Sequence, residues 1–349
     1  MDIARRFDAN PILSPGDIRP SAKGLEVVCA LNPGAFEYDG KIWLAVRVAE
    51  RPPVHQGAVS AVMLDAESRV TAVEFDPGVP GVDARDPRVI HKDGVMYLTT
   101  VSQFRLFVSG DGEKFSDAGF PPYAGSGPLE SFGVEDVRIA AIEGKYCLTY
   151  TAVSATGCAV GLALTTDWKT FDRKGVIFKP WNKDCAVFPE RIQGRYICLN
   201  RPSADGGSNI WLATSPDLIH WEDNREIVRC RPGSWDSARI GANGPPFRVP
   251  GGWLALYHGA DRDNRYCLGA LLLDGKDPAK VLARSAEPVM EPVADYECKG
   301  FFGNVVFSNG QVVRGDDILL YYGASDEYVC GARLSIRGGL AGMRMTPDV

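Results

Sequence analysis

Short polar turns followed by aromatic or β-branched runs recur along the whole chain. Each turn contains glycine, and the run after it is rich in residues that fit a pleated sheet. The segments that share this pattern are residues 38–43, 92–97, 143–146, 193–196, 251–253 and 314–318. Turns of this composition adopt positive φ between two antiparallel strands. The pattern therefore predicts six β-hairpins, without helical spacing of apolar residues between them.

The spacing of these hairpins indicates a repeated sheet unit. They recur roughly every 50 to 60 residues, which favours a β-propeller over a sandwich or a parallel α/β sheet. Six hairpins would give six blades, but we interpret the one within residues 84–117 as an insertion that completes the first blade. The predicted fold is therefore all-β, a five-bladed β-propeller. We expect one catalytic propeller domain over residues 1–349, with short N- and C-terminal extensions.

Polar residues lie close to the predicted turns, where the inner strands of a propeller would begin or end. These residues are Asn32, Arg47, Asp136, Arg138, Lys183, Asp184, Glu190, Arg201, Arg239, Asn304 and Asp326. A propeller gathers its inner strands around one axis, and buried charges are costly unless they are paired. We therefore predict a polar site at the axis, with a salt-bridge network between blades as the alternative. Because neighbouring side chains on a strand face opposite sides, one of Glu135 and Asp136 is expected to face this site.

Bulk composition narrows the class of protein. The chain is 45% hydrophobic with a net charge of −6, so no global attraction for nucleic acid or a membrane surface is expected. Neither the N-terminal segment nor any other stretch predicts a signal peptide or a membrane span. Nine cysteines without a C-x-x-C pair predict reduced thiols and a cytoplasmic protein. The four histidines lack metal-site spacing and no nucleotide-binding motif occurs, so neither a metal nor a cofactor is expected.

Four motifs in the same order resemble those of glycoside hydrolase family 130, the β-mannoside phosphorylases and related β-mannosidases. They are G-V-E-D-V-R-I at 133–139, N-K-D-C-A-V-F-P-E at 182–190, W-D-S-A-R-I-G at 235–241 and Y-Y-G-A-S-D at 321–326. The resemblance extends roughly over residues 8 to 335. The R-V-A-E-R-P run at 47–52, and D-P-R at 86–88 followed by Y-L-T-T at 97–100, are most similar to members that act on β-1,2-linked manno-oligosaccharides.

This resemblance implies a five-bladed propeller, an inverting reaction and a set of site residues. Asp136 matches the proton donor, whose proton passes through the mannosyl 3-hydroxyl, and Asp326 matches a residue that holds sugar hydroxyls. The matching phosphate-binding residues are Lys183, Arg201 and Arg239. Further predicted substrate contacts are Asn32, Arg47, Arg138, Asp184, Glu190, His258 and Asn304. For His258 a structural role is an equal alternative.

The residue types agree with phosphorolysis. An inverting hydrolase activates water with a second carboxylate, whereas phosphate is already nucleophilic and needs cations to hold it. Three basic residues from separate segments therefore favour a phosphorylase. Two departures from the family pattern are Asn200, where phosphorylases commonly have histidine, and Val137, where proline is usual. If the missing histidine weakens phosphate binding, Glu190 or Asp236 could act as a base for water.

The leading hypothesis is a phosphorylase that converts β-mannosides, with β-1,2-linked oligomers as the expected donors, and inorganic phosphate to α-mannose 1-phosphate in a reversible reaction. An inverting β-mannosidase on the same fold is the second hypothesis, and a non-catalytic glycan-binding propeller is the third. The expected partners are a manno-oligosaccharide and phosphate, with neither nucleic acid nor membrane. Linkage, acceptor, chain length and oligomeric state stay open, and a homo-oligomer is one alternative.

Overall fold

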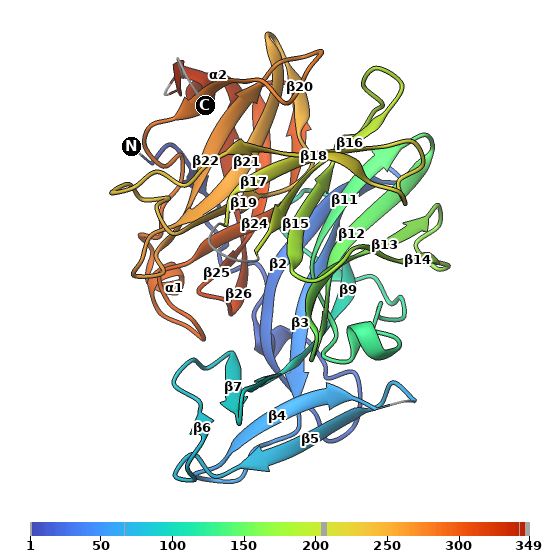
Figure 1. Cartoon of the computed structure of the whole chain (residues 1–349), viewed down its shortest axis with the longest axis vertical. Coiled ribbons are helices and arrows are strands. Elements are labelled where there is room, and N and C mark those ends of the chain that lie inside the picture. The colour runs from blue at the N-terminus through green and yellow to red at the C-terminus, as the bar shows by residue number, and fades with distance from the viewer. Residues whose placement is uncertain (1, 66, 204–207, 342, 346–349) are drawn as a thin grey trace.

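The computed structural model describes residues 2–65, 67–203, 208–341 and 343–345, and this part of the chain is built almost entirely from β-strands (Figure 1). The helical elements are the α-helices α1 (Asp295–Cys298) and α2 (Ile336–Ala341) and the 3-10 turns η1 (Pro15–Asp17) and η2 (Pro128–Glu130). The all-β prediction is confirmed. None of the helices in these ranges has the length and apolar character needed to cross a bilayer.

Three of the larger sheets have four antiparallel strands each. The first contains β2 (Glu26–Tyr38), β3 (Lys41–Arg51), β9 (Val101–Ser109) and β10 (Ser116–Asp117). The second contains β11 (Val134–Ile142), β12 (Lys145–Ser154), β13 (Gly157–Thr165) and β14 (Asp172–Phe178). The third contains β15 (Asn182–Val187), β16 (Tyr196–Pro202), β17 (Ile210–Ser215) and β18 (Glu222–Val228). Within each sheet the strands follow one another in chain order.

Two further sheets include strands from the ends of the chain. The fourth contains β19 (Arg239–Ala242), β20 (Phe247–Val249), β21 (Gly252–Ala260), β22 (Tyr266–Leu273), β23 (Val281–Ser285) and β27 (Met343–Met345). The fifth contains β24 (Val306–Arg314), β25 (Asp317–Ala324), β26 (Tyr328–Ser335) and the N-terminal strand β1 (Arg5–Arg6). Because β1 pairs with β26, residues from the start of the chain complete a sheet formed near its end.

All six predicted hairpin turns are confirmed. Asp39, Asp93, Glu143 and Gln193 adopt φ between 50° and 52°, and each is followed by a glycine with positive φ. In the other two turns the positive φ falls on Gly251 and on Gly252, the first residue of β21, and on Gly315 before β25. These turns succeed because glycine and short polar residues tolerate the left-handed conformation that a tight antiparallel connection needs.

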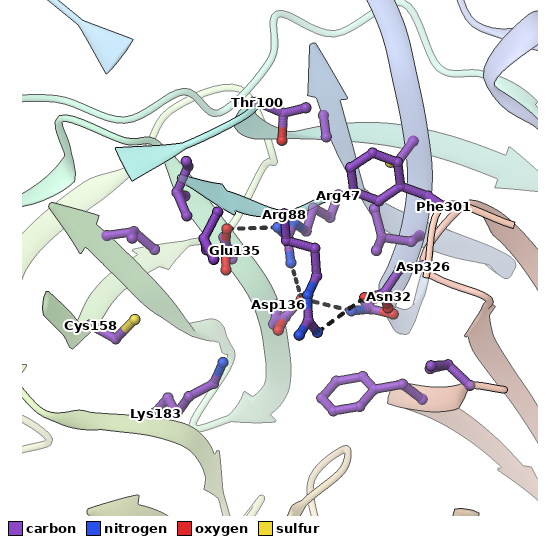
Figure 2. A pocket seen from close by; sticks show the side chains of 18 of the residues that line it. Asn32, Arg47, Arg88, Thr100, Glu135, Asp136, Cys158, Lys183, Phe301 and Asp326 are labelled. Atoms are coloured by element: carbon purple, nitrogen blue, oxygen red, sulfur yellow. Dashed lines mark hydrogen bonds and ion pairs between the residues drawn. The ribbon is translucent and has the colours of Figure 1, made fainter. Parts of the chain in front are cut away.

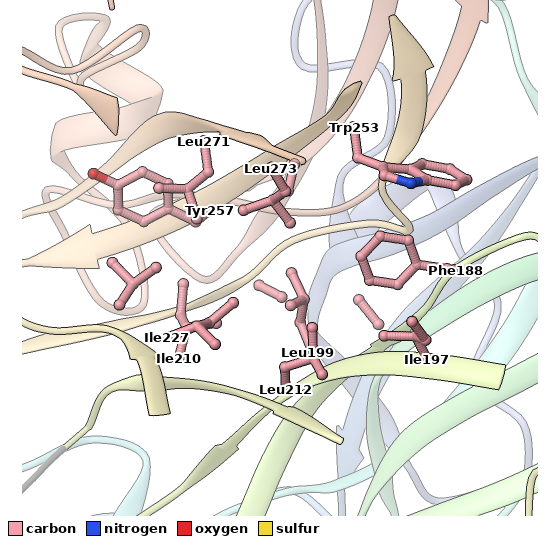
Figure 3. Close-up of a cluster of buried hydrophobic side chains, with 14 of the residues drawn as sticks. Phe188, Ile197, Leu199, Ile210, Leu212, Ile227, Trp253, Tyr257, Leu271 and Leu273 are labelled. Carbon is pink, nitrogen blue, oxygen red and sulfur yellow. The ribbon is translucent and has the colours of Figure 1, made fainter. Parts of the chain in front are cut away.

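The first strands of the sheets lie next to one another. Strand β2 contacts both β24 and β11, β11 contacts β15, and β15 contacts β19. Apolar side chains fill the space between neighbouring sheets, and Figure 3 shows the cluster between the third and fourth sheets. In it Leu199 and Leu212 pack with Tyr257 and Leu271, all at most 2% exposed. Burial of each such side chain contributes about 1.5–3 kcal/mol, so this packing fixes where the first strands meet.

An insertion over residues 52–100 interrupts the first sheet between β3 and β9. It forms one sheet from β4 (Val59–Leu64) and β5 (Val70–Phe75), and another from β6 (Val82–Asp83), β7 (Val89–Lys92) and β8 (Val95–Leu98). Figure 1 shows it at one end of the molecule, in light blue and cyan. Our interpretation of residues 84–117 was therefore half right. Strands β9 and β10 do complete the first sheet, but the β7–β8 hairpin belongs to the separate insertion.

Candidate active site

A cavity of about 250 Å³ lies where the first strands of the sheets meet the insertion. Its polar lining consists of Asn32, Arg47, Arg88, Thr100, Glu135, Asp136, Lys183, Arg201 and Asp326. Several of these side chains point toward one another in Figure 2. The sequence segments that carry them are far apart, so the prediction that acidic and basic residues meet in one polar site is confirmed.

Three first strands carry an Asn or Asp with positive φ at a β-bulge. Asn32 has φ 44°, Asp136 has φ 54° and Asp184 has φ 55°. At each the pairing register shifts, between Leu31 and Gly34, between Glu135 and Arg138, and between Lys183 and Ala186. A bulge re-aims side chains, and Asn and Asp tolerate the left-handed region best after glycine. As a result both Glu135 and Asp136 line the cavity, and our expectation that strand alternation would admit only one of them was wrong.

Asp136 is held by an amide and a guanidinium group. Its Oδ1 accepts hydrogen bonds from Asn32 Nδ2 at 3.0 Å and from Arg47 Nη1 at 3.1 Å. The other end of the same guanidinium, Arg47 Nη2, donates to Glu135 Oε1 at 2.6 Å (Figure 2). Burial raises the pKa of Asp136, but Arg47, followed by Lys183 and Arg138, outweighs burial and holds this pKa below its usual value.

A basic wall adjoins Asp136. Lys183 and Arg201 are register partners on β15 and β16, and both line the cavity. The ammonium group of Lys183 forms no hydrogen bond or ion pair within the part of the chain that the structure describes, and nearby Asp184 contributes to a pKa above the usual value although burial opposes it. Arg201 is 7% exposed, and its Nε is buried without a hydrogen-bond partner in the same ranges. Buried donors without partners are rare, so this wall is suited to bind an anion.

A buried charge network supports the basic wall from behind. Asp184 Oδ1 accepts from Arg138 Nη2 at 2.9 Å, and Asp184 Oδ2 lies 3.0 Å from Arg201 Nη1. His258 Nε2 lies 3.1 Å from the same Arg201 nitrogen, and His258 Nδ1 lies 3.1 Å from Asn243 Oδ1. Burial lowers the pKa of His258 to about 4, although Asp184, whose Oδ2 lies 3.3 Å from His258 Nε2, opposes this shift, so the ring is neutral near pH 7. Arg138, Asp184 and His258 therefore hold the wall in place and do not line the cavity.

Two motif glycines permit this close packing. A Cβ on Gly241 would lie 2.2 Å from Asp184 Oδ2 and 2.6 Å from His258 Cε1. A Cβ on Gly323 would lie 2.0 Å from Asn32 Oδ1. All three distances are far shorter than van der Waals contact. The glycines of the W-D-S-A-R-I-G and Y-Y-G-A-S-D segments are thus required by the side chains that pack against them.

Asp326 faces Arg88, which the insertion supplies. Arg88 Nη1 lies 3.8 Å from Asp326 Oδ2, and the guanidinium lies 3.7 Å from the centre of the Phe302 ring. The same guanidinium is bonded to Asp86 through two nitrogens, at 2.8 and 3.0 Å. Burial raises the pKa of Asp326 to about 6, although Arg88 and Arg47 oppose this shift. The cavity therefore holds one carboxyl group that titrates near neutral pH.

Some predicted residues do not line the cavity. Glu190 is exposed and ion-paired with Arg248, because it lies in the segment that follows the end of β15 at Val187. Asn304 is exposed, and its backbone oxygen accepts from Tyr266. Arg239 is not among the residues that line the cavity, but its guanidinium lies 5.3 Å from the centre of the Tyr266 ring, which does line it. The assignments of Glu190 and Asn304 to the substrate site are therefore corrected, and Arg239 as a phosphate ligand stays a prediction.

Asp236, considered as a base for water, also lies outside the cavity lining. It is fully buried and accepts hydrogen bonds from Arg231 and, at 2.9 Å, from Tyr257 Oη. It also contacts Arg284. A carboxylate bound this way stabilises the fourth sheet and has no access to a water molecule beside the substrate.

The sequence analysis missed several residues that line the cavity. Arg88 was noted only as part of the D-P-R run, and Trp181 and Tyr266 were not considered, yet all three line the cavity. Trp181 directly precedes the N-K-D-C segment, which is a local signal that could have identified it. Neither Arg88 nor Tyr266 had such a signal, because the placement of the insertion and of β22 depends on long-range packing.

Comparison with protein families assigns the chain to one of them. The Glyco_hydro_130 model, described as beta-1,4-mannooligosaccharide phosphorylase, matches residues 43–340. A beta-1,2-mannobiose phosphorylase of Listeria innocua is 40% identical over 339 residues, which is 95% of this chain and 96% of the relative. A 1,2-beta-oligomannan phosphorylase of Thermoanaerobacter sp. is 40% identical over 244 residues, 69% of this chain and 81% of the relative.

A solved structure shares the fold over nearly its whole length. It is that of the Listeria innocua beta-1,2-mannobiose phosphorylase in complex with beta-1,2-mannobiose. The TM-score is 0.94 at 39% identity, and the match covers 97% of this chain and 98% of the other. The similarity therefore includes the insertion as well as the larger sheets.

Proposed function

The chain belongs to glycoside hydrolase family 130, and on this premise we propose that it is an inverting phosphorylase of β-mannosides. It cleaves β-mannosidic bonds, with β-1,2-linked manno-oligosaccharides as donors, and transfers the mannosyl group to inorganic phosphate. The observation that carries this conclusion is the cavity in which the buried carboxyl group of Asp136 shares a wall with Lys183 and Arg201. Such an arrangement provides an acid for the leaving oxygen and cations for the phosphate.

The reaction breaks the bond between C1 of the terminal mannose and the bridging oxygen. A phosphate oxygen held by Lys183 and Arg201 attacks C1 from the opposite face, which inverts the configuration to α. The proton of Asp136 reaches the bridging oxygen through the mannosyl 3-hydroxyl, and Asp136 is reprotonated before the next turnover. The products are α-mannose 1-phosphate and the shortened oligomannoside, and the same steps in reverse build the bond.

The side chains that line the cavity favour phosphorolysis over hydrolysis. Glu190 and Asp236, the two carboxylates considered as bases for water, are ion-paired elsewhere. Lys183 in the basic wall has an ammonium group that forms no direct ion pair among the described residues. Phosphate needs no base and does need such cations. Inorganic phosphate is accordingly proposed as the co-substrate, without a bound cofactor.

We further propose that the five larger sheets are the blades of a five-bladed propeller. The contacts that link the first strands β24, β2, β11, β15 and β19 support this arrangement, as does the pairing of β1 with β26. A reducing cytoplasm is the proposed compartment, because all nine cysteines are free.

Omission of phosphate tests the proposed reaction directly. With β-1,2-mannobiose as substrate, we expect α-mannose 1-phosphate and mannose in equal amounts when phosphate is present, and almost no cleavage when it is absent. Anomer-resolved NMR of the product and a mannose assay measure both quantities. Release of free mannose at an unchanged rate without phosphate would identify a hydrolase. No cleavage in either condition, for any β-mannoside tested, would leave the glycan-binding alternative.

The raised pKa of Asp326 predicts that activity falls at acidic pH. The ionised carboxylate accepts hydrogen bonds from sugar hydroxyls, so kcat/KM should fall as pH decreases through the pKa of about 6. Arg88 lowers this pKa, because its cation favours the charged carboxylate. In Arg88→Gln the pKa of Asp326 rises further, and the acidic limb of the pH–activity profile should move to higher pH.

Arg85→Gln provides the matched control for this shift. Arg85 lies on the same insertion, but it is exposed and its guanidinium bonds to Asp83. Its replacement should leave the acidic limb unchanged. If both variants keep the wild-type profile, Asp326 does not control this limb.

A further inference from the structure

One tryptophan lies exposed at the cavity. All seven tryptophans fall in the described ranges, and six are buried or half-buried, as Trp168 and Trp253 are in the core. Trp181 is 44% exposed although it lines the same cavity as Asp136, which is 3% exposed. An exposed indole is costly in water and common where a ligand covers it. Trp181 therefore marks the entrance of the cavity, and Asp136 its inner end.

The backbone holds the indole in this position. Gly157, at the start of β13, has φ 111°, and a Cβ there would lie 2.7 Å from Trp181 Cε2 and 2.8 Å from Cζ2. The ring thus rests directly on the glycine backbone. The backbone oxygen of Trp181 accepts from Ser203 N at 3.1 Å, which ties the segment to the end of β16. The indole is therefore fixed before a ligand arrives, which reduces the entropy lost on binding.

The chemistry of mannose matches such a surface. In a β-mannopyranose the C–H bonds at C1, C3 and C5 point to one face of the ring, and the axial oxygen at C2 points to the other. The first face is apolar and can cover an aromatic ring, while hydroxyl groups at the rim stay free for polar contacts. A β-1,2 linkage occupies the oxygen on the opposite face and leaves the apolar face open.

We propose that Trp181 is the stacking platform for the sugar on the leaving side of the scissile bond, and that Gly157 is the residue that positions it. This inference rests on the proposed function. Because mannose 1-phosphate is released from the end of the oligomer, that terminal mannose occupies the inner end of the cavity beside Asp136. The remainder of the oligomer must pass the entrance, where Trp181 lies. The same ring is the acceptor in the synthetic direction, so Trp181 determines how well acceptors bind.

Steady-state kinetics of Trp181→Ala and Trp181→Phe in the full-length enzyme test this assignment. In Trp181→Ala we expect the KM for β-1,2-mannobiose, and the KM for acceptor mannose in synthesis, to rise roughly tenfold. The KM for phosphate should not change, because Lys183 and Arg201 remain. Trp181→Phe should retain part of the affinity. Gly157→Ala should reproduce the effect of Trp181→Ala, since its methyl group displaces the indole.

Ile219→Ala is the matched control, because Ile219 is also an exposed hydrophobic residue but lies outside the cavity lining. It should leave every constant at the wild-type value. The proposal is overturned if Trp181→Ala keeps the wild-type KM for mannobiose and for acceptor mannose. It is also overturned if the KM for phosphate rises as much as the KM for sugar. A separate assay tests the proposed function itself: if the wild-type enzyme cleaves mannobiose without phosphate, the proposed function is wrong.

Discussion

Replacement of Asp136 with asparagine is expected to slow phosphorolysis roughly 10²- to 10⁴-fold while the protein stays folded. Asparagine has nearly the same shape and can still accept hydrogen bonds from Asn32 and Arg47. It cannot supply the proton that the bridging oxygen needs as the bond to C1 breaks. The loss should therefore appear in kcat for β-1,2-mannobiose, with a smaller change in KM. Steady-state assays, together with the far-ultraviolet circular dichroism spectrum, measure both effects.

Two comparisons separate proton donation from a general disturbance of the site. Glu135→Gln removes the neighbouring carboxylate that Arg47 also binds, and it should retain much more activity than Asp136→Asn. A β-mannoside with a phenolate leaving group needs little protonation, so the loss in Asp136→Asn should be smaller for this donor. Equal losses in the two variants, or the same loss for both donors, would show that Asp136 is not the acid.

The electrostatics of the cavity would couple the proposed acid, Asp136, to the proposed co-substrate, phosphate. Arg47 and Lys183 hold the pKa of Asp136 below its usual value, and this disfavours the protonated form that a proton donor requires. Phosphate bound to Lys183 and Arg201 would bring negative charge into the same cavity. Its charge offsets that of the cations and raises the pKa of Asp136. On the proposed mechanism, bound phosphate would thereby favour the protonated form of Asp136 in the complex that reacts.

Local sequence patterns predicted the hairpins well, whereas the sheet to which each hairpin belongs depends on pairing between distant segments and was predicted less well. The turn at Asp39 and Gly40 could be located because the two residues that need positive φ are adjacent in the sequence. The β7–β8 hairpin was recognised for the same reason, but its sheet was not, because strand partners are chosen by packing between distant segments. Thus the hairpins were predictable one by one, whereas the separation of the insertion from the first sheet was not.

The candidate site divides in the same way into residues that local motifs identified and residues that long-range packing places. The motif residues Asp136 and Lys183 were found from sequence, and the structure brings them into one cavity. The alternation rule failed at Glu135 because it assumes a regular strand, and the bulge at Asp136 breaks that regularity. The contribution of Arg88 could not be foreseen, since it depends on how the insertion folds over the first strands.

Asp184→Asn is expected to lower the free energy of unfolding by about 3 to 5 kcal/mol. Asp184 is 1% exposed and pairs with Arg138 at 2.9 Å and with Arg201 at 3.0 Å. Burial disfavours its charge, but Arg201 and then Arg138 hold the pKa of Asp184 well below its usual value, so it is an anion in the folded protein. A neutral amide leaves two buried guanidinium groups without their shared counter-charge. Urea unfolding, followed by circular dichroism, measures the change.

Glu190→Gln is the matched control, because Glu190 belongs to the same N-K-D-C-A-V-F-P-E segment and was predicted to share the site. It is exposed and its partner Arg248 is half-exposed, so loss of this ion pair should change the free energy of unfolding by only about 0 to 1 kcal/mol. A small loss in Asp184→Asn, comparable to that in Glu190→Gln, would contradict the network. The two carboxylates of one motif should differ in this way because the first lies at the bulge in β15 beside the cavity, whereas the second lies in the exposed segment after β15.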